Sequence, residues 1–440
     1  MAKSPEPIRM LAPANFREKL SRRALLQVGT ASAGLAIVAT ACGSSSSTGS
    51  AATTKAAPGD TAAPGDTAAP GDTTATTAAP GGLTGSTLPN ASGDWSRVIN
   101  KASGTLSMYT WGDYNDPDIV GSLADKELGV TMKVDYYTSN EDLITKLSSS
   151  NGASGFDVVV PTGPYIPQMV QKGLLEKFDK TKLPNMVNVD PLYLGKDWDK
   201  TNDYSVCKDW GTTGYMWDTT VVSKDITSWK EFFDATAGEA SGNCSWLDTS
   251  VNVCGPYFWA NGIDWTTEKK ADLDACEAFL VDKMASHIKA FDSYPSTAMA
   301  QGAYGLSMFW NGDARQAYVR IKEAGGKPEN FKWAIGAPDT ELWMDNYCIA
   351  KGAPNIAAAH AWINWLLVPE ISIKDLDYHG YNSGMKTMPA LIKELLPTLV
   401  NGNMIFFTDE QVKHMSTGTV NSAQDRLADI YNKVKAKAAG

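Results

Sequence analysis

The chain has 440 residues, of which 43% are hydrophobic and 20% charged, so it is long enough for two or three packed units. Its formal net charge of -10 argues against a protein that works by neutralising the phosphates of nucleic acid. Residues 1–41 are net basic, whereas 42–94 and 95–440 are net acidic, which indicates three regions of different character.

Residues 1–41 have the order of an export signal. A charged stretch, Arg17 to Lys19, precedes Ser-Arg-Arg-Ala-Leu-Leu at 21–26 and the apolar run Val28 to Ala41. The paired arginines resemble a twin-arginine signal, whose route carries folded proteins. Ala-Thr-Ala-Cys-Gly at 39–43 resembles a bacterial lipobox, which implies acylation of Cys42 and a lipid-anchored, extracytoplasmic protein. The alternative is a single transmembrane anchor with an incidental cysteine, but the apolar run is far below the ~20 residues needed to span a bilayer.

Residues 42–94 predict a disordered tether. Ser, Thr, Ala, Gly, Pro and Asp dominate, and Ala-Ala-Pro-Gly-Asp-Thr occurs three times between Ala56 and Thr73. Such a composition forms no core, and its random-coil reach is roughly 40 Å. The segment would hold the remaining body clear of the cell surface.

The body, 95–440, alternates short apolar runs with amphipathic stretches. Runs at 105–109, 130–136 and 156–160 predict strands, the last nearly all apolar as in a strand covered on both faces. Ser139 is a predicted helix N-cap, followed by an apolar face of Leu143, Ile144 and Leu147. This alternation is typical of an α/β fold. The pattern predicts further helices at 167–173, 229–235, 266–285, 296–303, 312–324, 356–367 and 421–437. Further strands are predicted near 204–207, 213–217, 305–309, 333–336 and 346–350.

The cysteines and histidines do not predict a metal site, and the sequence implies no cofactor. No two cysteines are spaced as Cys-x2-Cys, and the four histidines are scattered. Five cysteines after Cys42 permit at most two disulfides, with 15 possible pairings that the sequence does not choose among: Cys207, Cys244, Cys254, Cys276 and Cys348.

Seven short blocks, in order, resemble the spermidine/putrescine-binding proteins of bacterial ABC importers. They are Met108–Tyr114, Tyr137–Glu141, Phe156–Thr162, Asn202–Ser205, Trp210–Gly214, Met308–Asp313 and Leu342–Asp345. The resemblance covers essentially all of 104–440. It implies a two-lobe periplasmic binding protein fold of type II, with discontinuous lobes joined by a hinge. Lobe 1 would be 95–212 with 345–390, and lobe 2 would be 213–344 with 391–440.

The resemblance also implies which residues hold the ligand. A polyamine needs carboxylates for its ammonium groups and aromatic faces along its methylenes, each ring adding about 0.5–2 kcal/mol. The residues that match the family's binding positions, or lie directly beside them, are Trp111, Asp113, Tyr114, Thr162, Trp310, Trp343, Asp345 and Tyr381. Asp345 matches an amine anchor in the family.

The block 246–253 departs from the family, which places acidic residues where Thr249 and Asn252 stand. Because a buried ammonium without a charged partner is strongly disfavoured, this departure favours a shorter diamine or a cation with one strong anchor. The weaker candidates are residues near the departures or loosely aligned: Tyr165, Asp248, Thr249, Asn252, Asp313 and Asn421.

Several functions stay open at this point. The resemblance implies a monomeric binding protein that delivers a small cationic solute to a permease and its ATPase. The same role for another organic cation or an amino-acid-like solute is the alternative, and a chemosensor without transport is a further one. A hydrolase is disfavoured because no Gly-x-Ser-x-Gly, His-Glu-x-x-His or phosphate-loop motif occurs. A carboxylate pair of the glycosidase type is left open.

Overall fold

The computed structural model describes residues 90–150 and 152–440, which belong to one compact unit, Gly81–Gly440. The export signal, Cys42 and all of the tether before residue 90 lie outside the described residues. The tether's last residues already pack on the body, because Ala91 is buried and the hydroxyl of Ser92 donates to Glu394 over 2.8 Å. The body therefore begins a few residues before the predicted boundary at 95.

The strands of the described residues form one mixed sheet in the order β2-β1-β3-β10-β5-β8-β6-β7, with β4 and β12 also paired to β10, and β9 and β11 to β5. β1 lies parallel to both β2 and β3, whereas β10 runs antiparallel to β3 and to β5. The bounds are β1 Gly104–Trp111, β2 Val130–Tyr137, β3 Val158–Val159, β4 Leu175–Glu176, β5 Val206–Asp218, β6 Cys244–Trp246, β7 Ala290–Phe291, β8 Leu306–Trp310, β9 Phe331–Ile335, β10 Thr340–Ala350, β11 Asn382–Ser383 and β12 Met415–Ser416.

The helices follow local signals where the sequence carries them. Ser139 caps α4 by accepting a hydrogen bond from the Asp142 amide, as predicted. The α-helices are α3 Ala124–Leu128, α4 Asn140–Ser149, α5 Ile166–Gln171, α6 Trp229–Ala237, α7 Ser250–Asn261, α8 Lys270–Phe279, α9 Pro295–Ala300, α10 Asn311–Glu323, α11 Ile356–Leu366, α12 Pro369–His379, α13 Met388–Leu395, α14 Asp409–Lys413 and α15 Gln424–Ala438.

Several elements differ from the predicted ones, and those outside every predicted range are α3, α7, α12, α13, α14, β4, β6, β7, β11 and β12. The predicted strands at 204–207 and 213–217 are one continuous strand, β5, because the intervening charges Lys208 and Asp209 are buried and pair with each other. Helix α7 was not predicted: most of its residues are buried, so its sequence has no polar face and hence no helical period.

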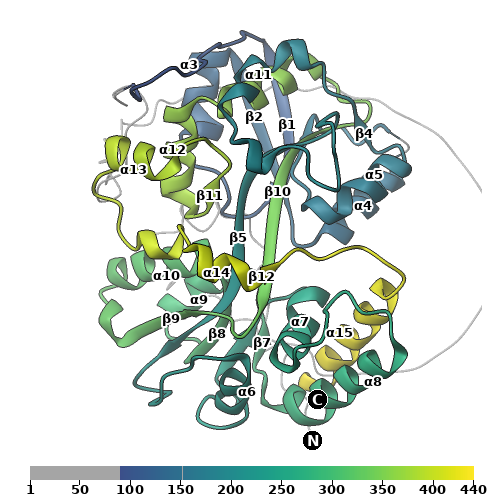
Figure 1. The fold of residues 1–440 in the computed structure, drawn as a ribbon, viewed down its shortest axis with the longest axis vertical. Helices are drawn as coiled ribbons and strands as arrows, with labels where there is room; N and C mark the ends of the chain where they lie inside the picture. Colours follow the sequence, from purple (N-terminus) through teal and green to yellow (C-terminus); the bar gives the residue numbers. More distant parts are fainter. Residues whose placement is uncertain (1–89, 151) are drawn as a thin grey trace, which may run out of the picture. The chain divides into compact units, whose positions relative to one another are not determined.

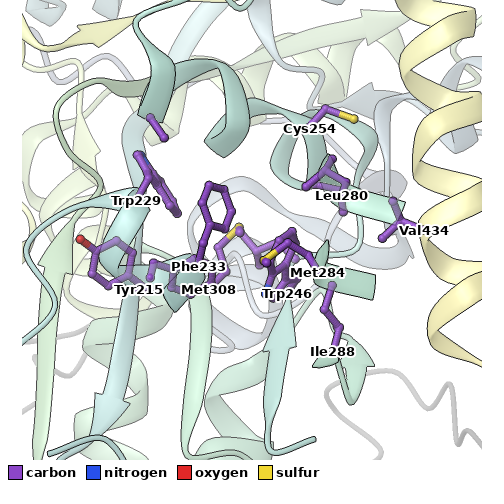
Figure 2. Close-up of a cluster of buried hydrophobic side chains, with 14 of the residues drawn as sticks. Tyr215, Trp229, Phe233, Trp246, Cys254, Leu280, Met284, Ile288, Met308 and Val434 are labelled. Carbon is purple, nitrogen blue, oxygen red and sulfur yellow. The ribbon is translucent and has the colours of Figure 1, made fainter. Parts of the chain in front are cut away.

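The two largest hydrophobic clusters lie in different parts of the chain. One cluster contains residues of β1, β3, α11 and the carboxyl-terminal part of β10, among them Leu106, Trp362 and Ile349. The other gathers α6, α7, α8 and α15 around β8, and Figure 2 shows part of it, including Trp229 and Trp246. These clusters are the cores of two lobes.

Strands β5 and β10 run side by side and contribute to both lobes, as Figure 1 shows. The predicted change of lobe after residue 390 falls inside α13. Met388, Leu391 and Leu395 of this helix pack in one cluster with Ile373 and Leu376 of α12. The chain therefore leaves this lobe only after α13.

The five cysteines within the described residues are all buried free thiols, so none of the possible disulfides is present among them. In 90–150 and 152–440, no three His, Cys, Asp or Glu side chains are arranged to hold a metal ion. The same residues contain no single helix long and apolar enough to cross a membrane. Helices α11 and α12 taken together have the length and the apolar composition of a membrane span, but the chain bends by 82° between them.

Candidate functional site

A pocket lies at the edge of the sheet where β1 and β3 end. Because β1 and β3 are parallel, their carboxyl ends share one edge of the sheet, and Trp111 and Thr162 follow from them into the pocket. The pocket holds about 1120 Å³ of empty space, open solvent at its mouth included. Most of the predicted site residues line it: Trp111, Asp113, Tyr114, Thr162, Tyr165, Thr249, Asn252, Trp310, Asp313, Trp343, Asp345 and Tyr381.

Asp248 and Asn421 do not line the pocket, and the structure gives them other partners. The Asp248 carboxylate accepts from the Tyr431 hydroxyl and the Lys435 ammonium of α15, both over 2.6 Å. The Asn421 amide donates to the carbonyl of Thr266 over 2.7 Å. Both residues therefore tie α15 and the segment before it to the second lobe.

Aromatic rings form the walls of the pocket. The rings of Trp111 and Trp310 lie 6.4 Å apart, edge to face, and those of Trp343 and Tyr381 lie 4.8 Å apart in the same manner. The Trp343 ring lies directly on Gly211 of β5, where a Cβ atom would come within 2.5 Å of the indole. Glycine at 211 therefore allows Trp343 to lie flat against the neighbouring strand.

One face of β10 supplies a row of three pocket residues. Glu341, Trp343 and Asp345 alternate with Leu342 and Met344, so they point to the same side of the strand. Glu341 was missed, although the alternation in Glu-Leu-Trp-Met-Asp was a signal that could have found it. The pocket also contains Glu141, Tyr294 and Gln424, which no local sequence pattern singled out.

Asp345 belongs to a buried chain of hydrogen bonds. Its Oδ2 lies 2.8 Å from the Tyr114 hydroxyl, which also bonds Asp209, while its Oδ1 has no partner. A phenol has one proton to donate, and Asp209, held by Lys208 over 2.7 Å, is the charged acceptor. Burial, with the charge of Asp209 adding to it, raises the pKa of Asp345 to about 7.

Asp313 is a second buried carboxyl at the pocket, at the start of α10. Burial raises its pKa to about 7, although the Ser296 hydroxyl and then Arg320 oppose the shift, and within the described residues its Oδ2 makes no hydrogen bond of good geometry. Within the described residues, Asp345 and Asp313 thus each present a buried carboxylate oxygen without a hydrogen bond of good geometry, although the hydroxyls of Thr162 and Ser296 lie close enough to oppose the rise in pKa, and such an oxygen favours a further donor.

Glu341 is a third buried carboxyl. Its Oε1 accepts hydrogen bonds from the Thr213 hydroxyl and from the Asn252 amide, the latter over 2.8 Å. Burial raises the pKa of Glu341, and these two donors and Trp310 oppose the rise.

Three contacts join the lobes around the pocket. The Tyr294 hydroxyl accepts from the Gly112 amide over 2.9 Å, with a Cβ at 112 excluded by the tyrosine ring. Arg320 of α10 pairs with Asp113 over 3.2 Å. The Gln424 amide of α15 donates to Glu141 of α4 over 2.8 Å. These contacts hold the walls together and enclose the pocket.

A two-lobe α/β fold with an enclosed pocket between its lobes defines a solute-binding protein of the type II class. The family of bacterial extracellular solute-binding proteins matches residues 119–394, and the chain belongs to this family. The resemblance to spermidine/putrescine-binding proteins and the predicted fold class are therefore confirmed.

Named relatives and a solved structure agree with this assignment. The chain is 29% identical over 335 residues to the spermidine/putrescine-binding periplasmic protein of Escherichia coli (strain K12), covering 76% of this chain and 92% of the relative. It is 28% identical over 323 residues to a putrescine-binding periplasmic protein of Pseudomonas aeruginosa, covering 71% and 86%. A solved spermidine/putrescine ABC transporter substrate-binding protein from Streptococcus pneumoniae superposes with a TM-score of 0.61 at 25% identity, covering 76% and 99%.

Proposed function

We propose that the chain is the substrate-binding component of an ABC importer and captures a polyamine in the pocket between its lobes. The observation that carries this proposal is the pair of unsatisfied carboxylate oxygens, on Asp345 and Asp313, beside the rings of Trp310 and Trp343. Ammonium groups would satisfy the carboxylates, while the rings would cover the methylenes and attract the charge. The named relatives, which bind spermidine and putrescine, support the same solute class.

The proposal makes the chain a binding protein and not an enzyme. It works as a monomer that closes on its solute and delivers it to a permease with its ATPase. Binding can drive closure only because the closed arrangement offers the solute more contacts than the open one. The additional contacts in the closed arrangement would come from residues of both lobes. These are Trp343 and Asp345 on β10 and Trp111 and Trp310 on the pocket walls.

A panel of solutes tests this function. The exported chain, residues 42–440 with Cys42→Ser, should bind putrescine or spermidine in titration calorimetry, and its scattering radius should fall on binding. Its unfolding free energy should rise by about 2.7 kcal/mol at a ligand concentration of one hundred times Kd. The uncharged isostere 1,4-butanediol and the zwitterion 4-aminobutanoate are the controls. Equal binding of a control would replace the polyamine with another solute, and a confirmed ligand that changes neither scattering nor tryptophan fluorescence would remove the closure mechanism.

The site of action in this proposal is the outer face of the cell membrane, or the periplasm, with Cys42 lipidated after export through the twin-arginine route. The full-length protein should fractionate with membranes, and Cys42→Ser should release it, because a hydrophobic peptide left behind is a weaker anchor than acyl chains. A Cys207→Ser variant, which alters a buried thiol far along the chain, is the control. Membrane association that survives Cys42→Ser after signal cleavage would contradict the lipid anchor.

A further inference from the structure

We propose that Glu341 is a further ammonium anchor of the pocket, besides Asp345 and Asp313, and stands in for the acidic side chains that Thr249 and Asn252 lack. This inference rests on the proposed function and names the residue that sets the length of the amine. The Glu341 side chain is buried, it lines the pocket, and within the described residues it makes no ion pair. Its donors are neutral groups, on Thr213, Asn252 and Trp310. A buried carboxylate held only by neutral donors is a position that a cation would occupy favourably.

Thr249 and Asn252 orient this carboxylate. The Thr249 hydroxyl donates to Oδ1 of Asn252 over 2.8 Å, which turns the amide nitrogen of Asn252 toward Glu341, 2.8 Å away. A carboxylate at 252 would lie against Glu341 with no proton between them, and two like charges at that distance disfavour each other. An acid at 252 and an acid at 341 are therefore alternatives, and this chain has the second arrangement.

The hydrogen bonds from Thr213 and Asn252 both fall on Oε1 of Glu341, and the ligand would approach the carboxylate beside Trp310, its third neutral donor. Asp345 lies four residues further along the same face of β10, with Trp343 between them. At roughly 3.3 Å per residue the two positions are about 13 Å apart. A linear triamine of spermidine length spans roughly 11 Å between its terminal nitrogens, whereas a butane diamine spans roughly 6 Å. The longer amine matches this backbone spacing better, and its chain can cross the Trp343 ring between the two carboxylates.

Glu341→Gln tests the proposal, because it removes the charge and keeps the size of the side chain. Titration calorimetry of the exported chain should show spermidine weakened by roughly tenfold to a hundredfold and putrescine by less than about threefold. The control is Glu323→Gln, at the exposed end of α10, which should change neither affinity. Thermal unfolding without ligand shows whether each variant is folded.

A second variant distinguishes loss of the Glu341 charge from a local distortion of the pocket as the cause of weaker spermidine binding. Adding Asn252→Glu to Glu341→Gln returns a carboxylate to α7 and should restore most of the spermidine affinity. Unchanged spermidine binding by Glu341→Gln overturns the anchor, and equal losses for both amines overturn the length selection. A failure of the double variant to regain affinity, when it is folded, also contradicts the exchange of the two acids. If the wild-type protein binds no amine at all, the proposed function fails and this inference with it; normal binding by wild type and Glu341→Gln alike overturns this inference alone.

Discussion

Asp345→Asn should weaken a cationic ligand by roughly tenfold to a hundredfold, since a hydrogen bond to a charged group is worth about 1.5–3 kcal/mol. The unpartnered Oδ1 of Asp345 is the atom that would accept from the ammonium group. Asparagine keeps the shape of the side chain, so the loss measures the charge. Trp343→Ala should cost a similar amount through lost packing and cation–π attraction, but it should also weaken any neutral solute that binds. A cation bound equally well by wild type and Asp345→Asn would remove the amine anchor.

The pH profile separates the charge of Asp345 from a change in packing. With a pKa of about 7, Asp345 is neutral below that pH and ionised above it, and an ammonium ligand selects the ionised form. Polyamine nitrogens resemble lysine and stay protonated through this range. The affinity of the wild type should therefore fall, as the pH drops from 7 to 5, by up to about tenfold per pH unit for each carboxyl group that the ligand needs ionised. Asp345→Asn should show a shallower slope, with the remainder due to Asp313, whose pKa is also about 7. An affinity that is constant from pH 8 to 5 would contradict this account.

Lys208→Met should lower the free energy of unfolding by about 3–5 kcal/mol, because it leaves buried carboxylates without their cation. The Lys208 ammonium lies 2.7 Å from Asp209 and 3.4 Å from Asp375, and 3.8 Å from the centre of the Tyr114 ring, with 1% of its side chain exposed. Burial, together with the charges of Lys208 and Arg315, holds the pKa of His379 well below the ordinary value, so in the wild type Lys208 is the cation beside Asp209. Burial lowers the pKa of Lys208, but Asp209 and Asp375 outweigh that effect and raise it overall, so the lysine is charged.

Denaturant unfolding of Lys208→Met measures this loss. The matched control is Lys177→Met, which removes an exposed lysine paired with Asp203 over 3.1 Å and should leave the unfolding midpoint within error. Because burial raises the pKa of Asp209 and of Asp375, these groups can take up protons when Lys208 is absent, so the difference between the variants should shrink in acid. Equal midpoints for the two variants at pH 7 would show that the buried cluster needs no cation.

The fold could be predicted where local pattern and tertiary environment agree. Alternating apolar positions predicted β1 and β2, and a polar N-cap residue before an amphipathic stretch predicted α4. The pattern failed at Lys208 and Asp209, because charges in a sequence usually mark the surface, and only tertiary structure brings Asp375 beside Lys208 and the His379 ring beside Asp209. The site shows the same division. Trp343 and Asp345 follow from a short motif, whereas the role of Glu341 depends on Asn252, which is 89 positions away in the chain.

The contacts that close the pocket act between protein groups alone. Tyr294 with Gly112, Arg320 with Asp113, and Gln424 with Glu141 would form in the same way around any cargo that fits. They therefore slow the release of any solute that the pocket holds. Of these residues Arg320 does not line the pocket, so a change at this position could hasten release while the lining that meets the solute stays the same.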